Sequence, residues 1–343
     1  MRQREHEDRT SDTDDGDAKE VARAQRSAGA DATSVGRFPA RAWVPIGQRT
    51  KLQLKENHVS LLAAGVSFRA LLAVVPAAVA AITIWGLVAD PQQITDQIAQ
   101  FAQMLPESGG QLVEEQLGQL TDQAGGTLGV ALVVSLLVAL WSASSGMLGL
   151  VEGIGAAYGE ADTRSFLRRR ALGLILTLAA LIFLLISLTL LTALPPILDA
   201  LGLEGSARMA VEVARWVGLA VLTAVGLAVI YRVGPDRASP RTRWVTWGAA
   251  LATVVWLLGS AAFSLYVSNF GEFDETYGSL AGVVIVMLWV FLSAFAVLIG
   301  ATVNAEIERQ TAVDTTIGPE RPLGERHAAR ADQLPSEYDP QHR

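Results

Sequence analysis

The 343-residue sequence contains no cysteine. Disulfide bridges, thiolate metal sites and cysteine nucleophiles are therefore excluded. Lysine is almost as scarce, and none of Lys19, Lys51 and Lys55 follows a glycine-rich loop. A P-loop is consequently missing, so we do not expect this chain alone to drive transport with ATP.

Histidine is also rare, and its four positions do not suggest a catalytic site. His6, His327 and His342 lie in the polar ends of the chain, and no two histidines have the spacing of zinc ligands. Neither a G-x-S-x-G nor an H-E-x-x-H pattern occurs. We therefore expect no enzyme activity, no metal or other cofactor, and no nucleic-acid partner. Residues 1–30 have no apolar core, so the first membrane span is expected to serve as the insertion signal.

Long apolar runs dominate the middle of the chain. About twenty apolar residues are enough to cross the hydrocarbon core of a bilayer. Residues 244–268 and 280–303 carry no charge, and a short acidic turn joins them. The sequence predicts an all-α polytopic membrane protein with six transmembrane helices, at residues 60–89, 127–150, 171–194, 210–233, 244–268 and 280–303.

The segments outside the spans are polar. Residues 90–126 contain six acidic residues and no Lys or Arg, and their apolar residues recur at helical spacing. They predict two short amphipathic helices outside the cytoplasm. Residues 1–39 and the tail at 306–343 have too few apolar residues to form a core and are expected to be disordered. Between the first of these and span one lies a basic segment with Trp43, which is either a simple flank of the span or a contact with anionic lipid headgroups.

Charge alternates from loop to loop, although the whole chain has a net charge of −7. Basic residues precede span one, follow span six, and fill the links between spans two and three and between spans four and five. The other three loops hold a single Arg, Arg208. Because cytoplasmic loops accumulate Lys and Arg, both termini are expected in the cytoplasm of a bacterium, with the spans in its inner membrane.

Three stretches resemble the YihY/virulence factor BrkB family of bacterial inner-membrane proteins, once labelled ribonuclease BN. They are LLAAGVSFRALLAVVP, LWSASSGMLGLVEGIGAAYGEADTRSFLRRR and FSLYVSNFGEFDETYGSLAGVVIVMLWVFLSAFAVLIGATVNAEIER, and the resemblance covers residues 45–310. Two positions depart from the family pattern. Arg69 stands where the family often has Tyr, and Thr302 stands where a Glu often precedes the Asn matched by Asn304. The resemblance implies an inner-membrane architecture and defines no biochemical activity.

Arg69 is the most unusual residue because it falls inside the first predicted span. An arginine within a bilayer usually faces a cavity or a partner. If Arg69 is internal, we expect it to pair with an anionic ligand or with Glu152 or Glu306. If the span instead begins near Ala70, Arg69 extends toward the headgroups. Glu152 lies in the expected link after span two, where it is either a packing residue or part of a gate or ligand contact.

The remaining candidates lie at the ends of the closing hairpin. Asn269 and Tyr277 flank its outer turn and serve either the turn itself or an external substrate vestibule. Asn304 and Glu306 close the last span, where Asn304 either hydrogen-bonds across helices or contacts a substrate.

Two functions fit these features. The first is a transporter or exporter of a small amphiphile, lipid or anion, with the six candidate residues along its path. The second is a scaffold that organises the envelope without transport and uses the acidic helices at 90–126 as a docking surface. A homo-oligomer is compatible with either function.

Overall fold

A computed structural model of the chain describes residues 29–88, 128–192, 197–198, 200, 205–269 and 281–333. These residues form helices and turns, and within them only an isolated bridge between Pro240 and Thr316 has β pairing. The α-helices are α2 (Trp43–Glu56), α3 (Val59–Val88), α6 (Leu128–Tyr158), α7 (Phe166–Thr192), α9 (Gly205–Val233), α10 (Thr242–Asn269) and α12 (Ala281–Arg309).

The apolar runs of the sequence become these helices, as expected for backbone that must satisfy its own hydrogen bonds in lipid. Five stretches are long and apolar enough to cross a membrane: Leu136–Tyr158, Phe166–Leu191, Gly205–Val233, Trp244–Ser268 and Ala281–Arg309. In α3, the apolar stretch Val59–Ala73 is shorter than these five. The all-helical prediction is confirmed with five to six candidate spans, and the predicted helices at 90–126 lie outside the described residues.

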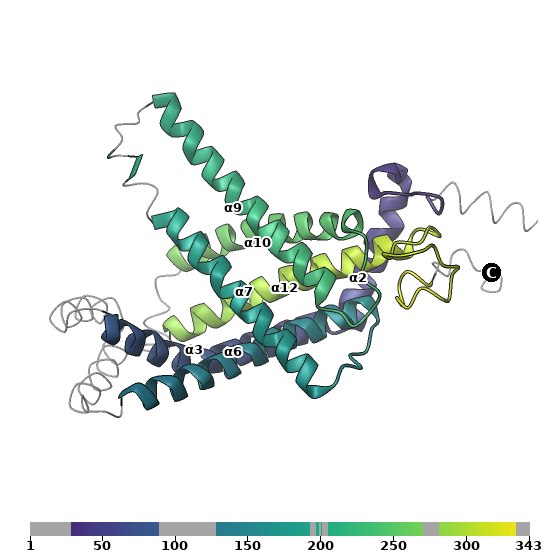
Figure 1. Ribbon diagram of the computed structural model, residues 1–343. Coiled ribbons are helices and arrows are strands. Elements are labelled where there is room, and N and C mark those ends of the chain that lie inside the picture. Colours follow the sequence, from purple (N-terminus) through teal and green to yellow (C-terminus); the bar gives the residue numbers. More distant parts are fainter. Residues whose placement is uncertain are drawn as a thin grey trace, which may run out of the picture.

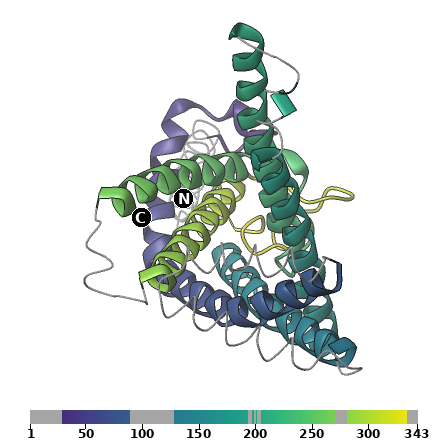
Figure 2. The same cartoon turned by 90° about the vertical axis from the view of Figure 1, so that its left-hand side faces the viewer.

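Four helices form a packed group, and two others lie to one side of it. α3 packs along α6, α10 along α12, and α12 along α3 (Figures 1 and 2). α7 packs on α6 and α9 packs on α10, and both cross the four-helix group obliquely and diverge from it (Figure 1). Very little of the most apolar stretch of α7 and none of that of α9 is buried, although Tyr231 near the end of α9 lies in the core. Both helices therefore present apolar surface over most of their length.

Small residues allow the helices of the core to approach closely. The core unites buried side chains from α3, α6, α9, α10 and α12, including Ala63, Ala249, Ala301 and Ala305. Gly248 of α10 and Gly300 of α12 face each other so closely that a Cβ on either would overlap the backbone of the other helix. Small residues at such crossings are the usual means of helix association in membranes.

Both described ends of the chain fold onto one end of the bundle, which we call the capped end; its cap consists of residues 29–42 and 310–333. The cap buries Val35, Phe38 and Ala42 against Ile46, Trp244 and Ile307. Thr311 donates its hydroxyl to the carbonyls of Ala30 and Ala32, at 3.0 and 2.9 Å, so the two segments are tied together. The expectation of disorder is therefore wrong for residues 29–39 and 310–333.

Side chain to backbone hydrogen bonds explain why the tail folds despite its polar composition. The Arg326 guanidinium donates to the carbonyls of Ala312 and Ala331, at 2.5 and 2.7 Å. Asp314 accepts the backbone N–H groups of Thr316 and Arg321, both at 2.9 Å. These contacts replace a large apolar core with a network of satisfied polar groups.

Helix ends also differ from the expected spans. α6 continues to Tyr158, so Glu152 lies in the helix and not in a link. α7 begins at Phe166 and α12 extends to Arg309. These additional turns lie at the capped end, where the charged residues they carry find partners of opposite charge.

The crossing of α10 and α12 generates a stability prediction. Gly300→Ala should destabilise the protein by about 1–3 kcal/mol, because the added methyl group meets backbone that cannot move aside. Gly218→Ala on α9 is the matched control, since a Cβ there meets no other atom within 4 Å. The measurement is the thermal unfolding midpoint in detergent. Equal midpoints for the two variants would contradict the close crossing.

Candidate functional site

Polar side chains at the capped end form two separate groups. The first contains Arg69, which lies ten residues after Val59, the start of α3. That separation is about 15 Å along a helix. The Arg69 side chain is 47% exposed, and its Nη1 lies 3.4 Å from Oε2 of Glu152, whose side chain is 40% exposed. Arg69 is thus neither sealed in the core nor tightly paired.

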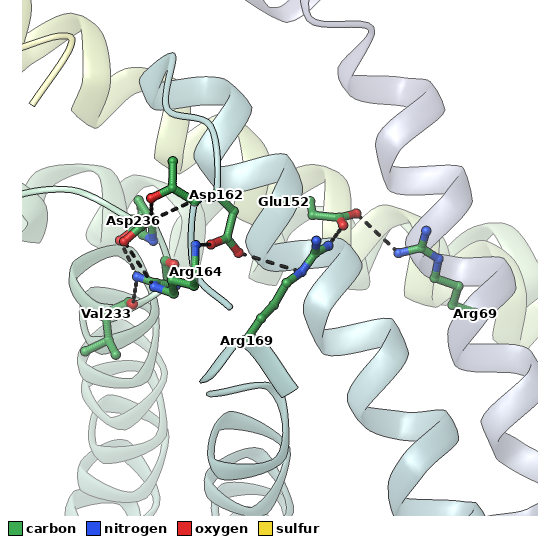
Figure 3. Close-up of polar contacts among 10 residues, drawn as sticks. Arg69, Glu152, Asp162, Arg164, Arg169, Val233 and Asp236 are labelled. Carbon is green, nitrogen blue, oxygen red and sulfur yellow. Dashed lines mark hydrogen bonds and ion pairs between the residues drawn. The ribbon is translucent and has the colours of Figure 1, made fainter. Parts of the chain in front are cut away.

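Glu152 lies between two arginines. Its other oxygen, Oε1, contacts the guanidinium of Arg169 from α7 more closely than Oε2 contacts Arg69 (Figure 3). Arg169 in turn approaches Asp162 of the α6–α7 link, with Nε and Oδ2 3.7 Å apart. The chain of charges therefore joins α3, α6, the link and α7.

The same chain of charges reaches the end of α9 through Arg164. Its Nε lies 3.2 Å from Oδ1 of Asp236, and its Nη1 donates to the Gly234 carbonyl at 2.8 Å (Figure 3). A cation that donates to carbonyls just beyond Val233 stabilises the C-terminus of that helix. We call this chain the open charge network; it consists of Arg69, Glu152, Arg169, Asp162, Arg164 and Asp236.

A pocket of about 270 Å³ opens beside the open charge network. Glu152, Asp162, Arg169 and Asp236 all contribute to its wall, and Arg69 lies outside that wall. Glu160 also lines the pocket and accepts the backbone N–H of Ala329 at 2.6 Å, so the cap touches the pocket edge. Burial raises the pKa of the Glu160 carboxyl above its usual value.

Glycine at position 149 makes room for Arg69. A Cβ there would lie 2.7 Å from Nη1 of Arg69. One turn earlier, Gly146 faces the backbone of Ala70. The absence of side chains on this stripe of α6 lets the Arg69 guanidinium lie across the helix and reach Glu152.

The second group is buried at the end of α12, and we call it the sealed charge group; it consists of Arg49, Glu306, Arg237 and Glu308. Arg49 of α2 donates from Nε to Oε2 of Glu306 at 2.8 Å. Arg49 also contacts the side chain of Gln310. Glu306 has no exposed surface, so this contact is shielded from water and ties α2 to α12.

Arg237 and Glu308 form the tightest pair of this group. Two parallel bonds join them, from Nη1 and Nη2 to the two carboxylate oxygens at 2.7 and 2.8 Å. Both side chains are fully buried, and the guanidinium lies 4.0 Å above the ring of Tyr158. Burial alone would lower the pKa of Arg237, but the Glu308 carboxylate outweighs it and raises that pKa. The pair anchors the α9–α10 link to α12.

Asn304 joins α12 to α10. Its Oδ1 accepts the Gly248 N–H at 2.7 Å, and its Nδ2 donates to the Val245 carbonyl at 3.0 Å. The hydrogen bond across helices that the sequence suggested for Asn304 is therefore present. Thr302 donates its hydroxyl to the carbonyl of Leu298, one turn earlier in the same helix.

The structure brings only some of the six candidate residues together. Arg69 and Glu152 meet in the open charge network, whereas Asn304 and Glu306 are buried, and the partner of Glu306 is Arg49. The side chain of Asn269 and all of Tyr277 lie outside the described residues.

Sequence reasoning missed most of the partners. The charge pattern of the sequence counts Arg49, Arg164, Arg169 and Arg237 only as basic residues of flanks and links, and it does not indicate which carboxylate each one meets. The available signal was the pair Glu306 and Glu308, since residues two apart on a helix point to different sides and each needs its own cation. Among the described residues, no three His, Cys, Asp or Glu side chains converge as metal ligands would.

Comparison with known proteins identifies the family to which this chain belongs. The family described as Virulence factor BrkB matches residues 51–324, which include α3 to α12, the second half of α2 and part of the cap. The chain belongs to the virulence factor BrkB family. The matched region contains the open charge network and all of the sealed charge group except Arg49, and the match confirms the resemblance seen in the three sequence stretches.

Several relatives carry only general names. The ribonuclease-like protein YfkH of Bacillus subtilis is 29% identical over 229 residues, which cover 64% of this chain and 80% of YfkH. A UPF0761 membrane protein of Idiomarina loihiensis is 26% identical over 215 residues, covering 61% of this chain and 71% of its own. A UPF0761 membrane protein of Chromobacterium violaceum is 26% identical over 255 residues, which cover 73% of this chain and 58% of the relative. No solved structure matched the chain.

The buried pair of Arg237 and Glu308 should be essential for stability. Glu308→Gln leaves the guanidinium buried without a counter-charge, which typically costs about 3–5 kcal/mol. Arg237→Met combined with Glu308→Leu should recover much of that loss, because an apolar pair needs no compensation. Unfolding midpoints in detergent test both, with Glu325→Gln in the exposed part of the tail as control. A single variant as stable as the control would refute the anchoring role.

Asp236 should make the capped end sensitive to acid. Hydrogen bonds from Thr163, with help from Arg164, hold the pKa of Asp236 below its ordinary value of 3.8 despite some burial. A lowered pKa stabilises the folded state above the unfolded value, and this contribution disappears as the pH falls through the folded value. The unfolding midpoint of the wild type should therefore fall between about pH 5 and 3.

In Asp236→Asn the acid-induced fall should be shallower, because the variant cannot lose that carboxylate. Glu320→Gln, a change of an exposed carboxylate in the tail, should follow the wild-type curve. Superimposable curves for Asp236→Asn and wild type would show that the Thr163 contact does not stabilise the fold.

Proposed function

We propose that this chain is a transporter of a small amphiphile, lipid or anion, not driven by ATP binding to the chain itself. It is a multi-pass membrane protein of the BrkB family, and we place its capped end in the cytoplasm because the basic links gather there. The observation that carries the proposal is the state of Arg69: a cation within an apolar helix, half exposed and only loosely paired.

The surroundings of Arg69 suit a ligand with a negative head and an apolar part. On α3, Phe68 precedes Arg69 and Leu72 lies one turn further along the helix, and both are 57% exposed. A guanidinium offers five N–H donors, and the 3.4 Å contact with Glu152 engages one of its nitrogens. An incoming anionic group could therefore bind Arg69 while Leu72 contacts its apolar part.

The open charge network gives such binding a consequence. An anion on Arg69 competes with Glu152, whose other oxygen contacts Arg169. Release of Glu152 from Arg69 loosens α3 from α6 and α7, whereas the sealed charge group keeps α2, α12 and the α9–α10 link in place. We infer that α7 and α9, which have little buried surface, are the helices that move.

The test is flux through reconstituted vesicles. Wild-type protein should move fluorescently labelled phosphatidylglycerol or chloride across the bilayer, and Arg69→Ala should reduce the rate at least about tenfold. Folding should be nearly unchanged, because a half-exposed ion pair contributes only about 0–1 kcal/mol. Arg168→Ala is the matched control, since Arg168 is exposed near the start of α7.

Two outcomes would overturn the proposal. Equal flux in wild type and Arg69→Ala would remove Arg69 from the path. No flux of either probe above that of empty vesicles would remove transport of lipids and simple anions. Either outcome would favour the scaffold function, whose expected docking surface at residues 90–126 lies outside the described residues.

A further inference from the structure

α2 differs from the other helices in direction. It runs across the end of the four-helix group, whereas α3, α6, α10 and α12 run along one another (Figures 1 and 2). A helix that crosses the end of a membrane-spanning bundle lies along the bilayer surface and not through it. α2 therefore has one face toward the bundle and an opposite face that the bundle leaves uncovered.

The face toward the bundle is fully used. Ile46, Arg49 and Thr50 are buried, with Arg49 paired to Glu306 and Ile46 packed against Trp244 and Ile307. These contacts fix the rotation of α2 about its own axis. Its opposite face is therefore presented to the surroundings in a defined orientation.

The opposite face combines apolar and basic side chains. Val44 and Leu52 are 63% and 56% exposed, and Lys51 and Lys55 are exposed one turn apart. Arg41 precedes the helix and Glu56 ends it, so exposed basic side chains outnumber acidic ones three to one. Amphipathic helices that lie in the headgroup region of acidic membranes have this combination.

An aromatic pair marks the depth of α2. Trp43 at its start and Trp247 of α10 have ring centroids 6.1 Å apart, and both are partly exposed. Tryptophan is enriched at the boundary between hydrocarbon and headgroups. Since Trp247 belongs to a candidate span, the pair connects α2 with the apolar surface of α10.

We propose that the exposed face of α2, formed by Val44, Lys51, Leu52 and Lys55, docks on the acidic headgroup layer of the membrane that holds the chain. The lysines bind lipid phosphates, and Val44 and Leu52 enter the region just below them. This contact is independent of transport, because none of these four residues belongs to either charge group.

The absence of cysteine allows a sharp test. Leu52→Cys introduces a unique thiol for a spin label in the full-length chain. The protein is reconstituted into bilayers of phosphatidylcholine alone or with phosphatidylglycerol, and label accessibility to oxygen and to a water-soluble nickel complex is measured. We expect the label to lose most of its nickel accessibility only in the acidic bilayer.

Two further variants provide the controls. Lys51→Gln with Lys55→Gln, in the Leu52→Cys background, should abolish the effect of phosphatidylglycerol. Leu323→Cys carries the same label on an exposed leucine of the cap and should remain accessible to nickel in both bilayers.

Three results would overturn the proposal. They are a label at position 52 that stays in water in both bilayers, one that is buried equally in both, and an effect of phosphatidylglycerol that persists without the lysines. Spin–spin broadening at position 52 would assign this face to a second copy of the chain and would also overturn it.

Discussion

The buried ion pairs at the end of α12 are the constraint on which the capped end depends. Glu306 and Glu308 have no exposed surface, so each must be neutralised within the protein. Arg49 and Arg237 do so from positions far away in the sequence, before the first span and between α9 and α10. α2, α12 and the α9–α10 link are thereby held in one arrangement, and the cap packs around it.

The two charge groups differ in burial, so one is suited to a structural role and the other to a functional role. Buried ion pairs cannot exchange partners without leaving an uncompensated charge, so the sealed charge group suits an anchor. The members of the open charge network are partly exposed, and Glu152 has two cations within reach. Such contacts are individually weak and exchangeable, which suits a site where a ligand competes with protein groups.

Hydropathy predicted the membrane architecture well, because helices in lipid need long uninterrupted apolar runs. Hydropathy did not predict that the polar segments at the capped end are folded. The last turn of α12 carries Glu306 and Glu308, and their pairing with Arg49 and Arg237 makes the burial of these two carboxylates tolerable. The tail was expected to be disordered because it has few apolar residues, yet Arg326 and Asp314 organise it through backbone hydrogen bonds that no hydropathy pattern reveals. The pairing of Glu306 was equally hidden, since Arg49 lies 257 residues away and nothing local connects them.

The cap touches the sealed charge group and the edge of the pocket beside the open charge network. Arg330 lies 3.8 Å from Glu306 and donates to Gln53 of α2 at 2.8 Å. One residue earlier, the Ala329 N–H binds Glu160 at the edge of the pocket. The loop between α6 and α7 is thus held at Glu160 by the anchored cap and at Asp162 by the exchangeable arginines. The start of α7 is consequently tied through a short link to the cap, and Arg170 adds a direct contact by donating to the Trp141 carbonyl of α6 at 2.7 Å.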